Sequence, residues 1–192
     1  MPDTSLPSHS VDARTRILDA ATRIAAERGV TALTLDSAAR EAGVSKGGLL
    51  YHFASKEALL SGLLTRLTES IEAEFEAVWT AQPEGRGRTT RALLAWAFDN
   101  PEMVCAHHEQ AAGIFLAAFH QDPALLDPVR QFFARTRARL MEDGLPPGHG
   151  FTVMAACDGL FMADIFQMYE LDETQRQEIR RALETLLREP SA

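Results

Sequence analysis

The chain has 192 residues, of which 46% are hydrophobic and 24% are charged, and 19 basic and 27 acidic side chains give a formal net charge of −8. A chain of this length and apolar content can bury a core, which excludes an intrinsically disordered protein. Cys105 and Cys157 are too few and too far apart for a disulfide framework or a thiolate zinc cluster. No signal peptide and no apolar run near the ~18 residues of a membrane span is found. We therefore expect a globular cytoplasmic protein.

Helix-forming residues dominate the composition, and no segment has the pattern of a strand, so the sequence predicts an all-α fold of about nine helices. Glycine and proline clusters bound the helical segments. The expected helices span residues 11–28, 34–42, 45–53, 56–81, 89–99, 102–120, 123–142, 151–169 and 173–188. The first ten residues are expected to form a flexible tail. Asp172 and Gln175 resemble a capping box at the start of the last helix.

Charge is distributed unevenly along the chain. Residues 1–56 carry 7 basic and 6 acidic side chains, whereas residues 57–192 carry 12 basic and 21 acidic ones. An acidic body repels a polyanion, so a contact with nucleic acid would have to be made by the N-terminal part. The acidic net charge therefore localises such a contact and does not exclude it.

A helix, a tight turn and a second helix follow one another between Thr34 and Phe53. Thr34 can cap the first helix and Ser45 the second, because a side-chain oxygen can accept a hydrogen bond from the free amides of a helix start. Gly43 lies in the turn, and alanines at positions 38, 39 and 42 are small enough to let the two helices approach closely. This pattern predicts a helix-turn-helix whose second helix faces outward.

The stretch from Thr15 to Leu64 resembles the DNA-binding domain of the TetR (tetracycline-repressor-like) family. The residues that match the family pattern, without a gap, are Thr34, Ala42-Gly43-Val44-Ser45, Gly47, Leu49, His52-Phe53 and Lys56-Glu57. The resemblance implies a flexible tail (1–10), a three-helix helix-turn-helix domain that binds DNA (11–56) and a helical domain for ligand binding and dimerisation (57–192).

The resemblance also implies which residues contact a double-stranded DNA operator. Side chains on the outer face of the second helix would read base edges, while hydroxyls and cations near the helix ends would bind phosphates. The expected DNA-binding residues are Thr34, Ser45, Lys46, Gly47, Gly48, Leu50, Tyr51, His52 and Lys56. The family usually has Tyr where Leu50 stands, so either Tyr51 takes over that phosphate contact or the contact is lost. Gly48 and Ala38 also depart from the family pattern.

Two helices, expected at residues 151–169 and 173–188, are joined by a short turn near the end of the chain. In the family, this pair packs against its copy in a second subunit. The resemblance therefore implies a homodimer whose recognition helices lie about 34 Å apart and match a palindromic operator. The alternative is that Leu183, Leu186 and Leu187 only complete the core of their own subunit.

Bulky apolar side chains are frequent in the middle helices, and the resemblance implies that some of them line a cavity for a small apolar or amphipathic effector. The candidate ligand-binding residues are Trp96, Met103, His107, Glu109, Phe115, Phe119, Phe133, Met154, Asp158, Phe161 and Met162. Each of the apolar ones can instead be ordinary core. An acidic group in such a cavity would suit a cationic ligand, although Asp158 can equally belong to helix packing.

Potential metal ligands are concentrated at Cys105, His107, His108 and Glu109. Adjacent histidines on a helix point about 100° apart, whereas a chelating pair usually stands at i and i+4, so we expect neither a metal site nor a cofactor. There is also no glycine-rich phosphate loop and no GxSxG motif, which makes an enzyme built on these residues and Asp158 a remote alternative. The leading hypothesis is a repressor released from DNA by its effector. The main alternative is a DNA-binding regulator that needs no ligand.

Overall fold

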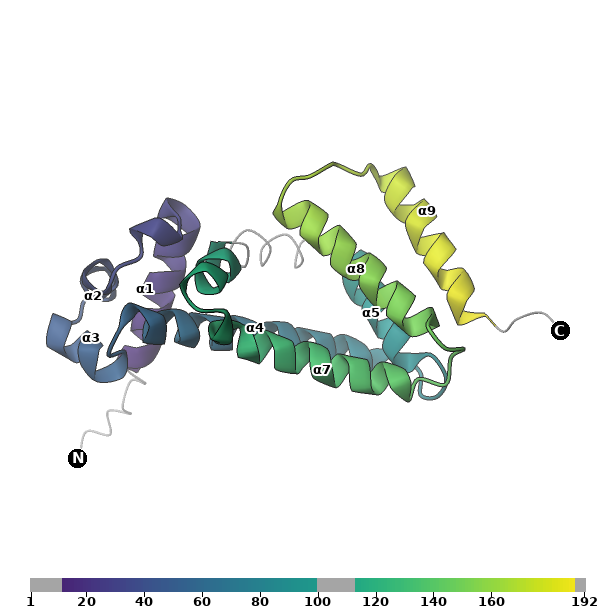
Figure 1. Cartoon of the computed structure of the whole chain (residues 1–192), viewed down its shortest axis with the longest axis horizontal. Helices are drawn as coiled ribbons and strands as arrows, with labels where there is room; N and C mark the ends of the chain where they lie inside the picture. The colour runs from purple at the N-terminus through teal and green to yellow at the C-terminus, as the bar shows by residue number, and fades with distance from the viewer. Residues whose placement is uncertain (1–11, 100–112, 189–192) are drawn as a thin grey trace, which may run out of the picture. The chain divides into compact units, whose positions relative to one another are not determined.

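The computed structural model describes residues 12–99 and 113–188, and within these ranges the chain forms helices and no strand. The α-helices are α1 (Ala13–Arg28), α2 (Leu35–Ala42), α3 (Lys46–His52), α4 (Lys56–Ala81), α5 (Arg88–Asp99), α7 (Asp127–Met141), α8 (His149–Ile165) and α9 (Glu173–Glu184) (Figure 1). Residues 113–121 are also helical, and short 3-10 helices occupy Val30–Ala32, Pro123–Leu126 and Thr185–Leu187. The predicted all-α fold is confirmed. None of the helices in these ranges has the length and apolarity that a membrane crossing would need.

Contacts between Cα atoms divide the chain into two compact units, one ending at Leu63 and the other beginning at Leu64. The division falls inside α4, so about the first two turns of that helix belong to the N-terminal unit. The boundary expected from the sequence, at residue 56, lies before these turns. The assignment of DNA binding to the first part and of ligand binding to the second stays a prediction.

The N-terminal unit is organised around the apolar face of α1. Ile17, Leu18 and Ile24 of this helix are fully or almost fully buried, and α1 packs against both α2 and α3. Gly62 on α4 allows a close approach to this core, because a Cβ atom at this position would lie 2.8 Å from Cε1 of Phe53. The first turns of α4 therefore close the core of the unit that contains the helix-turn-helix.

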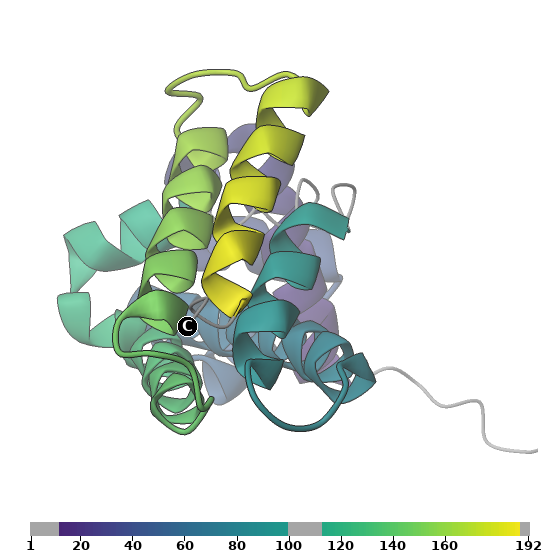
Figure 2. The ribbon, with the colours of Figure 1, turned by 90° about the vertical axis from the view of Figure 1, so that its right-hand side faces the viewer.

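In the C-terminal unit α5 packs against α7, α8 and α9, and Figure 2 shows α5 and α9 side by side. Its core contains Phe75, whose ring meets the rings of Trp96 and Phe132 edge to face at centroid distances of 5.7 and 5.8 Å. Leu183 of α9 is buried in the same core, and Leu186 and Leu187 pack against it. These leucines thus contribute to the core of their own subunit, and dimerisation through the last two helices stays a prediction.

The start of α5 is capped by a residue from a distant part of the chain. The buried carboxylate of Asp143, just after α7, accepts hydrogen bonds from the backbone amides of Thr89 and Thr90 at 2.7 and 2.9 Å. The Thr90 hydroxyl donates a third hydrogen bond at 2.6 Å. A carboxylate at a helix N-terminus satisfies free amides and interacts favourably with the helix dipole. Asp143 therefore fixes the end of α7 to the beginning of α5.

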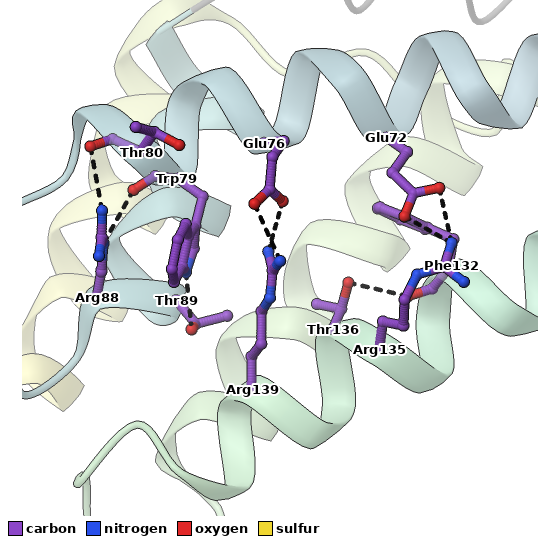
Figure 3. A network of polar contacts seen from close by, with 10 residues as sticks. All are labelled: Glu72, Glu76, Trp79, Thr80, Arg88, Thr89, Phe132, Arg135, Thr136 and Arg139. Atoms are coloured by element: carbon purple, nitrogen blue, oxygen red, sulfur yellow. Dashed lines mark hydrogen bonds and ion pairs between the residues drawn. The ribbon is translucent and has the colours of Figure 1, made fainter.

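Paired side chains connect α4 to α7 along one flank of the C-terminal unit (Figure 3). Arg135 donates to Glu72 at 2.7 Å, and one turn further on Arg139 makes a bidentate contact with Glu76 at 2.7 and 3.0 Å. The guanidinium groups of Arg139 and Arg88 also lie 4.5 and 3.8 Å from the centre of the Trp79 ring. Because both helices present partners at i and i+4, the contacts set the register of α4 against α7.

Several helix ends differ from those expected. The helix predicted to span 151–169 is α8, which begins at His149 after Gly148, a residue with φ 87°, and ends at Ile165. Gln167 has φ 48°, a left-handed conformation that interrupts the helix before the predicted end. The capping box at Asp172 and Gln175 is confirmed, with the Gln175 amide donating to the Asp172 carboxylate at 2.8 Å.

Candidate nucleic-acid interface and apolar cavity

The turn between α2 and α3 is defined by caps at both helices. The Thr34 hydroxyl accepts a hydrogen bond from the Ser37 amide at 3.0 Å, and the Ser37 hydroxyl accepts one from the Thr34 amide at 2.9 Å. Gly43 ends α2 with φ 64° and ψ 37°, a left-handed conformation that glycine adopts without strain. Ser45 then starts α3 by accepting a hydrogen bond from the Gly48 amide at 3.0 Å. The predicted helix-turn-helix, with Thr34 and Ser45 as its caps, is present.

The short helix α3 has one buried face and one exposed face. Leu49 is fully buried and Phe53, which follows the helix, is 3% exposed, so both belong to the core of the N-terminal unit. Tyr51 is 86% exposed and Leu50 is 39% exposed. A Cβ atom at Gly47 would meet no other atom within 4 Å, which leaves open space beside the backbone. A surface of this shape lets the helix backbone approach a duplex closely.

All the residues expected to bind DNA lie in this N-terminal unit. Thr34, Ser45, Lys46, Gly47, Leu50 and Tyr51 are exposed, whereas Gly48, His52 and Lys56 are partly buried. The rings of Tyr51 and His52 meet edge to face at 5.1 Å. Their exposure is compatible with contact to DNA, and the role of each residue stays a prediction.

One feature of this surface was not predicted. The Nζ atom of Lys46 lies 3.0 Å from a carboxylate oxygen of Asp36, at the start of α2, and both side chains are largely exposed. The ion pair crosses the turn and joins residues ten positions apart, so helical periodicity could not identify it. Asp36 therefore places a negative charge beside the predicted DNA-binding surface. Its carboxylate would compete with a DNA phosphate for the Lys46 ammonium group.

The C-terminal unit contains a cavity of about 260 Å³. It is lined by side chains from α4, α5, α7, α8 and α9 and from the segments 113–121 and 123–126. The candidate ligand-binding residues that line it are Trp96, Phe115, Phe133, Met154, Asp158, Phe161 and Met162. The cavity is mostly apolar with a few polar groups, as small-molecule sites are, and its volume lies just below their usual range of about 300–1,000 Å³.

Other candidates are placed differently. Phe119 does not line the cavity: it lies one helical turn beyond Phe115 and its side chain is 60% exposed. Met103, His107 and Glu109 lie outside the described residues, as do Cys105 and His108. Sequence reasoning missed the cavity residues of α4, namely Thr68, Ile71 and Glu74, together with Arg176 of α9, whereas Asp164 of α8 stands out in the sequence as an acidic residue on an otherwise apolar helix. The amphipathic pattern of α4 marked its buried side but could not separate core from cavity wall.

The polar groups of the cavity differ in their hydrogen-bond and ion-pair partners. Arg176 donates to both carboxylate oxygens of Asp164 at 2.9 Å, so these two charges neutralise each other. Ser70 donates a hydrogen bond to Glu74 at 3.3 Å. Asp158 is partly buried and receives no hydrogen bond from residues 12–99 or 113–188, and burial raises the pKa of its carboxyl to about 6. The arrangement leaves the Asp158 carboxylate without a hydrogen-bond or ion-pair partner among the described residues.

Neither cysteine chemistry nor metal binding is supported by the part of the chain that is described. Cys157 is a free, buried thiol, and burial raises its pKa to about 12, which keeps it protonated and unreactive. No group of three potential metal ligands is found in residues 12–99 and 113–188. The ligand cluster considered in the sequence, around His107, lies outside these ranges.

The chain is similar to known proteins in both of its units. Residues 17–63 match the family described as "Bacterial regulatory proteins, tetR family", and residues 87–188 match "Tetracyclin repressor-like, C-terminal domain". The HTH-type transcriptional regulator SrpR of Pseudomonas putida is 29% identical over 126 residues, which cover 57% of this chain and 59% of SrpR. The chain thus aligns with less than two thirds of this relative.

Solved structures share the fold over almost the whole chain. A member of the TetR family from Streptomyces coelicolor, SCO1917, is 27% identical with a TM-score of 0.65. The multidrug binding protein EbrR, solved in complex with ethidium, is 25% identical with a TM-score of 0.66. Each alignment covers 91% of this chain and 98% of the other protein. Together with the two family matches, these similarities establish that the chain belongs to the TetR family of DNA-binding transcriptional regulators.

Proposed function

We propose that this protein is a homodimeric repressor that binds a palindromic operator through α3 and leaves it when a small apolar or amphipathic effector enters the cavity of the C-terminal unit. The observation that most directly supports the proposal is the combination of a capped, outward-facing recognition helix with a separate apolar cavity. Such a regulator acts in the cytoplasm, where its operator is accessible.

In the DNA complex, the chemistry of each side chain decides whether it contacts bases or phosphates. Tyr51 and Leu50 extend from the exposed face of α3 and contact base edges or the sugar-phosphate backbone in the major groove. Lys46 exchanges its ion pair with Asp36 for a phosphate. The hydroxyls of Thr34 and Ser45 lie at helix starts, where backbone amides add further donors for phosphate. Binding of this kind weakens with salt, with a log–log slope near −0.9 for each phosphate contact.

Dimerisation through the last two helices is supported by the apolar side chains that the subunit leaves exposed. Met162 and Phe166, at the end of α8, are 43% and 48% exposed, and Met168 and Tyr169, in the following segment, are 60% and 52% exposed. A cluster of large apolar side chains on the surface is typical of a site that another protein covers. A two-fold axis through this region relates the two subunits of the dimer. The dimer then presents two copies of α3, one to each half-site of the operator.

Effector control requires that the cavity bind the effector with different affinity in the DNA-bound and the released forms. A ligand with equal affinity for both forms would not shift the equilibrium between them. Helix α4 is the element that can connect the two activities. Its first turns belong to the unit with the helix-turn-helix, and Thr68 and Ile71 further along the same helix line the cavity. The structure of EbrR with ethidium supports a cavity that accepts an organic molecule in a protein of this fold.

Selection of bound DNA from a random pool tests the proposal as a whole. The wild-type chain is expected to enrich an inverted repeat whose half-sites are separated by one helical turn, because two copies of α3 read equivalent half-sites. The enriched duplex is then challenged with a library of apolar and amphipathic compounds. Enrichment without inverted symmetry would contradict the dimeric arrangement, and an operator that no compound releases would favour a ligand-independent regulator.

A further inference from the structure

Among the described residues, the charged side chains that line the cavity are predominantly acidic. They are Glu74 from α4, Asp158 and Asp164 from α8, and Arg176 from α9. The Arg176 guanidinium contacts both oxygens of Asp164, so this pair contributes no net charge. The remaining carboxyl groups are those of Glu74 and Asp158, and only Glu74 has a hydrogen-bond donor, Ser70. The Asp158 carboxylate thus has neither a hydrogen-bond donor nor a basic partner among residues 12–99 and 113–188.

The wall of the cavity also contains aromatic rings. Trp96 from α5, Phe133 from α7 and Phe161 from α8 line the same cavity as Asp158. The faces of such rings carry partial negative charge and attract cations, and the attraction strengthens where water is excluded. The same rings stack on flat aromatic ligands. Carboxylate and ring faces therefore favour the same kind of molecule, an aromatic compound with a positive charge.

We propose that this cavity selects aromatic cations over neutral molecules of the same shape, with the carboxylate of Asp158 as the specificity-determining counter-charge. The inference rests on the proposed role of the cavity as the effector site and specifies the chemical class of the effector. An anionic ligand is disfavoured, because the positive charge of Arg176 is already neutralised by the Asp164 carboxylate.

The ionisation of Asp158 is consistent with this role. Burial raises the pKa of its carboxyl to about 6, so near neutral pH the group is ionised in an environment that disfavours its charge. A bound cation compensates for the lost solvation and therefore gains more from this carboxylate than from an exposed one. The other titratable groups around the cavity are Glu74, the Asp164–Arg176 pair and Cys157, whose thiol stays protonated because burial raises its pKa to about 12.

The test compares two three-ring dyes of nearly the same shape, the permanently charged 10-methylacridinium and the neutral 9-methylacridine. Both are titrated at pH 8 into the full-length dimer without DNA, and binding is followed by dye fluorescence. Wild type is expected to bind the cation about tenfold more tightly. Asp158→Asn is expected to reduce this preference several-fold by weakening the binding of the cation, while the aromatic rings retain a smaller preference. Glu178→Gln, which removes one exposed carboxylate of α9 outside the cavity, is the matched control and should keep the tenfold preference.

The outcomes separate this inference from the proposed function. Equal affinity of wild type for the two dyes, or an undiminished preference in Asp158→Asn, would overturn the role of Asp158 and leave an effector cavity for neutral molecules. Failure of both dyes to bind wild type would overturn the inference, and failure of the compound library to release the operator would separately contradict the proposed effector control. Circular dichroism of each variant verifies that a reduced preference is not a loss of folding.

Discussion

Replacing Asp158 by Asn is expected to stabilise the protein at pH 8 and to have little effect at acid pH. Burial raises the pKa of this carboxyl from its ordinary value of 3.8 to about 6. A group whose pKa is raised on folding supports the folded state below its unfolded pKa, and this support is lost as the pH rises through the folded pKa. Above pH 6, the wild-type protein therefore retains an ionised group that is less well solvated than in the unfolded chain.

The magnitude follows from the difference of about two pKa units, which corresponds to at most about 2.7 kcal/mol. Because the Asp158 side chain is only partly buried, solvent screening reduces the expected gain to about 1–2 kcal/mol at pH 8. Asparagine has nearly the same shape and no titratable proton. The gain should stay constant between pH 8 and about pH 7 and shrink as the pH falls from about 6 to about 4, between the folded and the unfolded pKa.

Urea unfolding at a fixed protein concentration measures this gain. The two tryptophans of the chain, Trp79 and Trp96, both lie in the C-terminal unit, so their fluorescence reports on the unit that contains Asp158. All other carboxyl groups are common to both proteins and cancel in the difference between them. A variant no more stable than wild type at pH 8, or equally favoured at pH 5 and pH 8, would refute the assignment of an unfavourably buried charge to this position.

Three further predictions follow from contacts of single residues. Asp143→Ala should destabilise the C-terminal unit by about 3–5 kcal/mol in the same urea assay, because the start of α5 loses three hydrogen bonds to a buried carboxylate; a cost below 1 kcal/mol would argue against the cap. Arg139→Met should cost about 1–2 kcal/mol through loss of Glu76 and the Trp79 ring, and a neutral result would show that water replaces both contacts. Asp36→Asn should tighten binding to specific and non-specific DNA alike, by about three- to tenfold at low salt in an anisotropy titration; unchanged affinity would place Asp36 away from the duplex.

The sequence predicted the N-terminal unit more accurately than the C-terminal one, for a physical reason. Caps, turns and short helices depend on neighbouring residues, so Thr34, Gly43 and Ser45 could be assigned from local pattern alone. The ion pair between Asp36 and Lys46 depends on how the turn folds back, and no periodicity indicates it. Local sequence patterns therefore predicted the helices, caps and turn of the candidate interface, but not the ion pair that Asp36 makes beside it.

In the C-terminal unit the composition of core and cavity is the same, so sequence could not assign individual residues to one or the other. Phe132 and Phe133 are adjacent in the chain, and only Phe133 was among the candidate ligand-binding residues. The structure buries Phe132 to 7% exposure and also places both rings at the cavity wall. The capping of α5 by Asp143 links residues more than fifty positions apart and lies beyond any local pattern. Long-range contacts of this kind required the folded structure.

The central claim is that α3 of this protein contacts its operator, and DNase footprinting of the selected operator tests it most directly. Wild type is compared with the double variant Lys46→Ala, Tyr51→Ala and with Arg137→Ala, which removes an exposed cation of the C-terminal unit. Because each lost contact costs about 1–2 kcal/mol and a dimer of the double variant loses two contacts in each half-site, it should protect the operator only at a concentration at least about 1,000-fold higher. Arg137→Ala should protect it like wild type. Protection by the double variant at the wild-type concentration would contradict the assignment of α3 as the recognition helix.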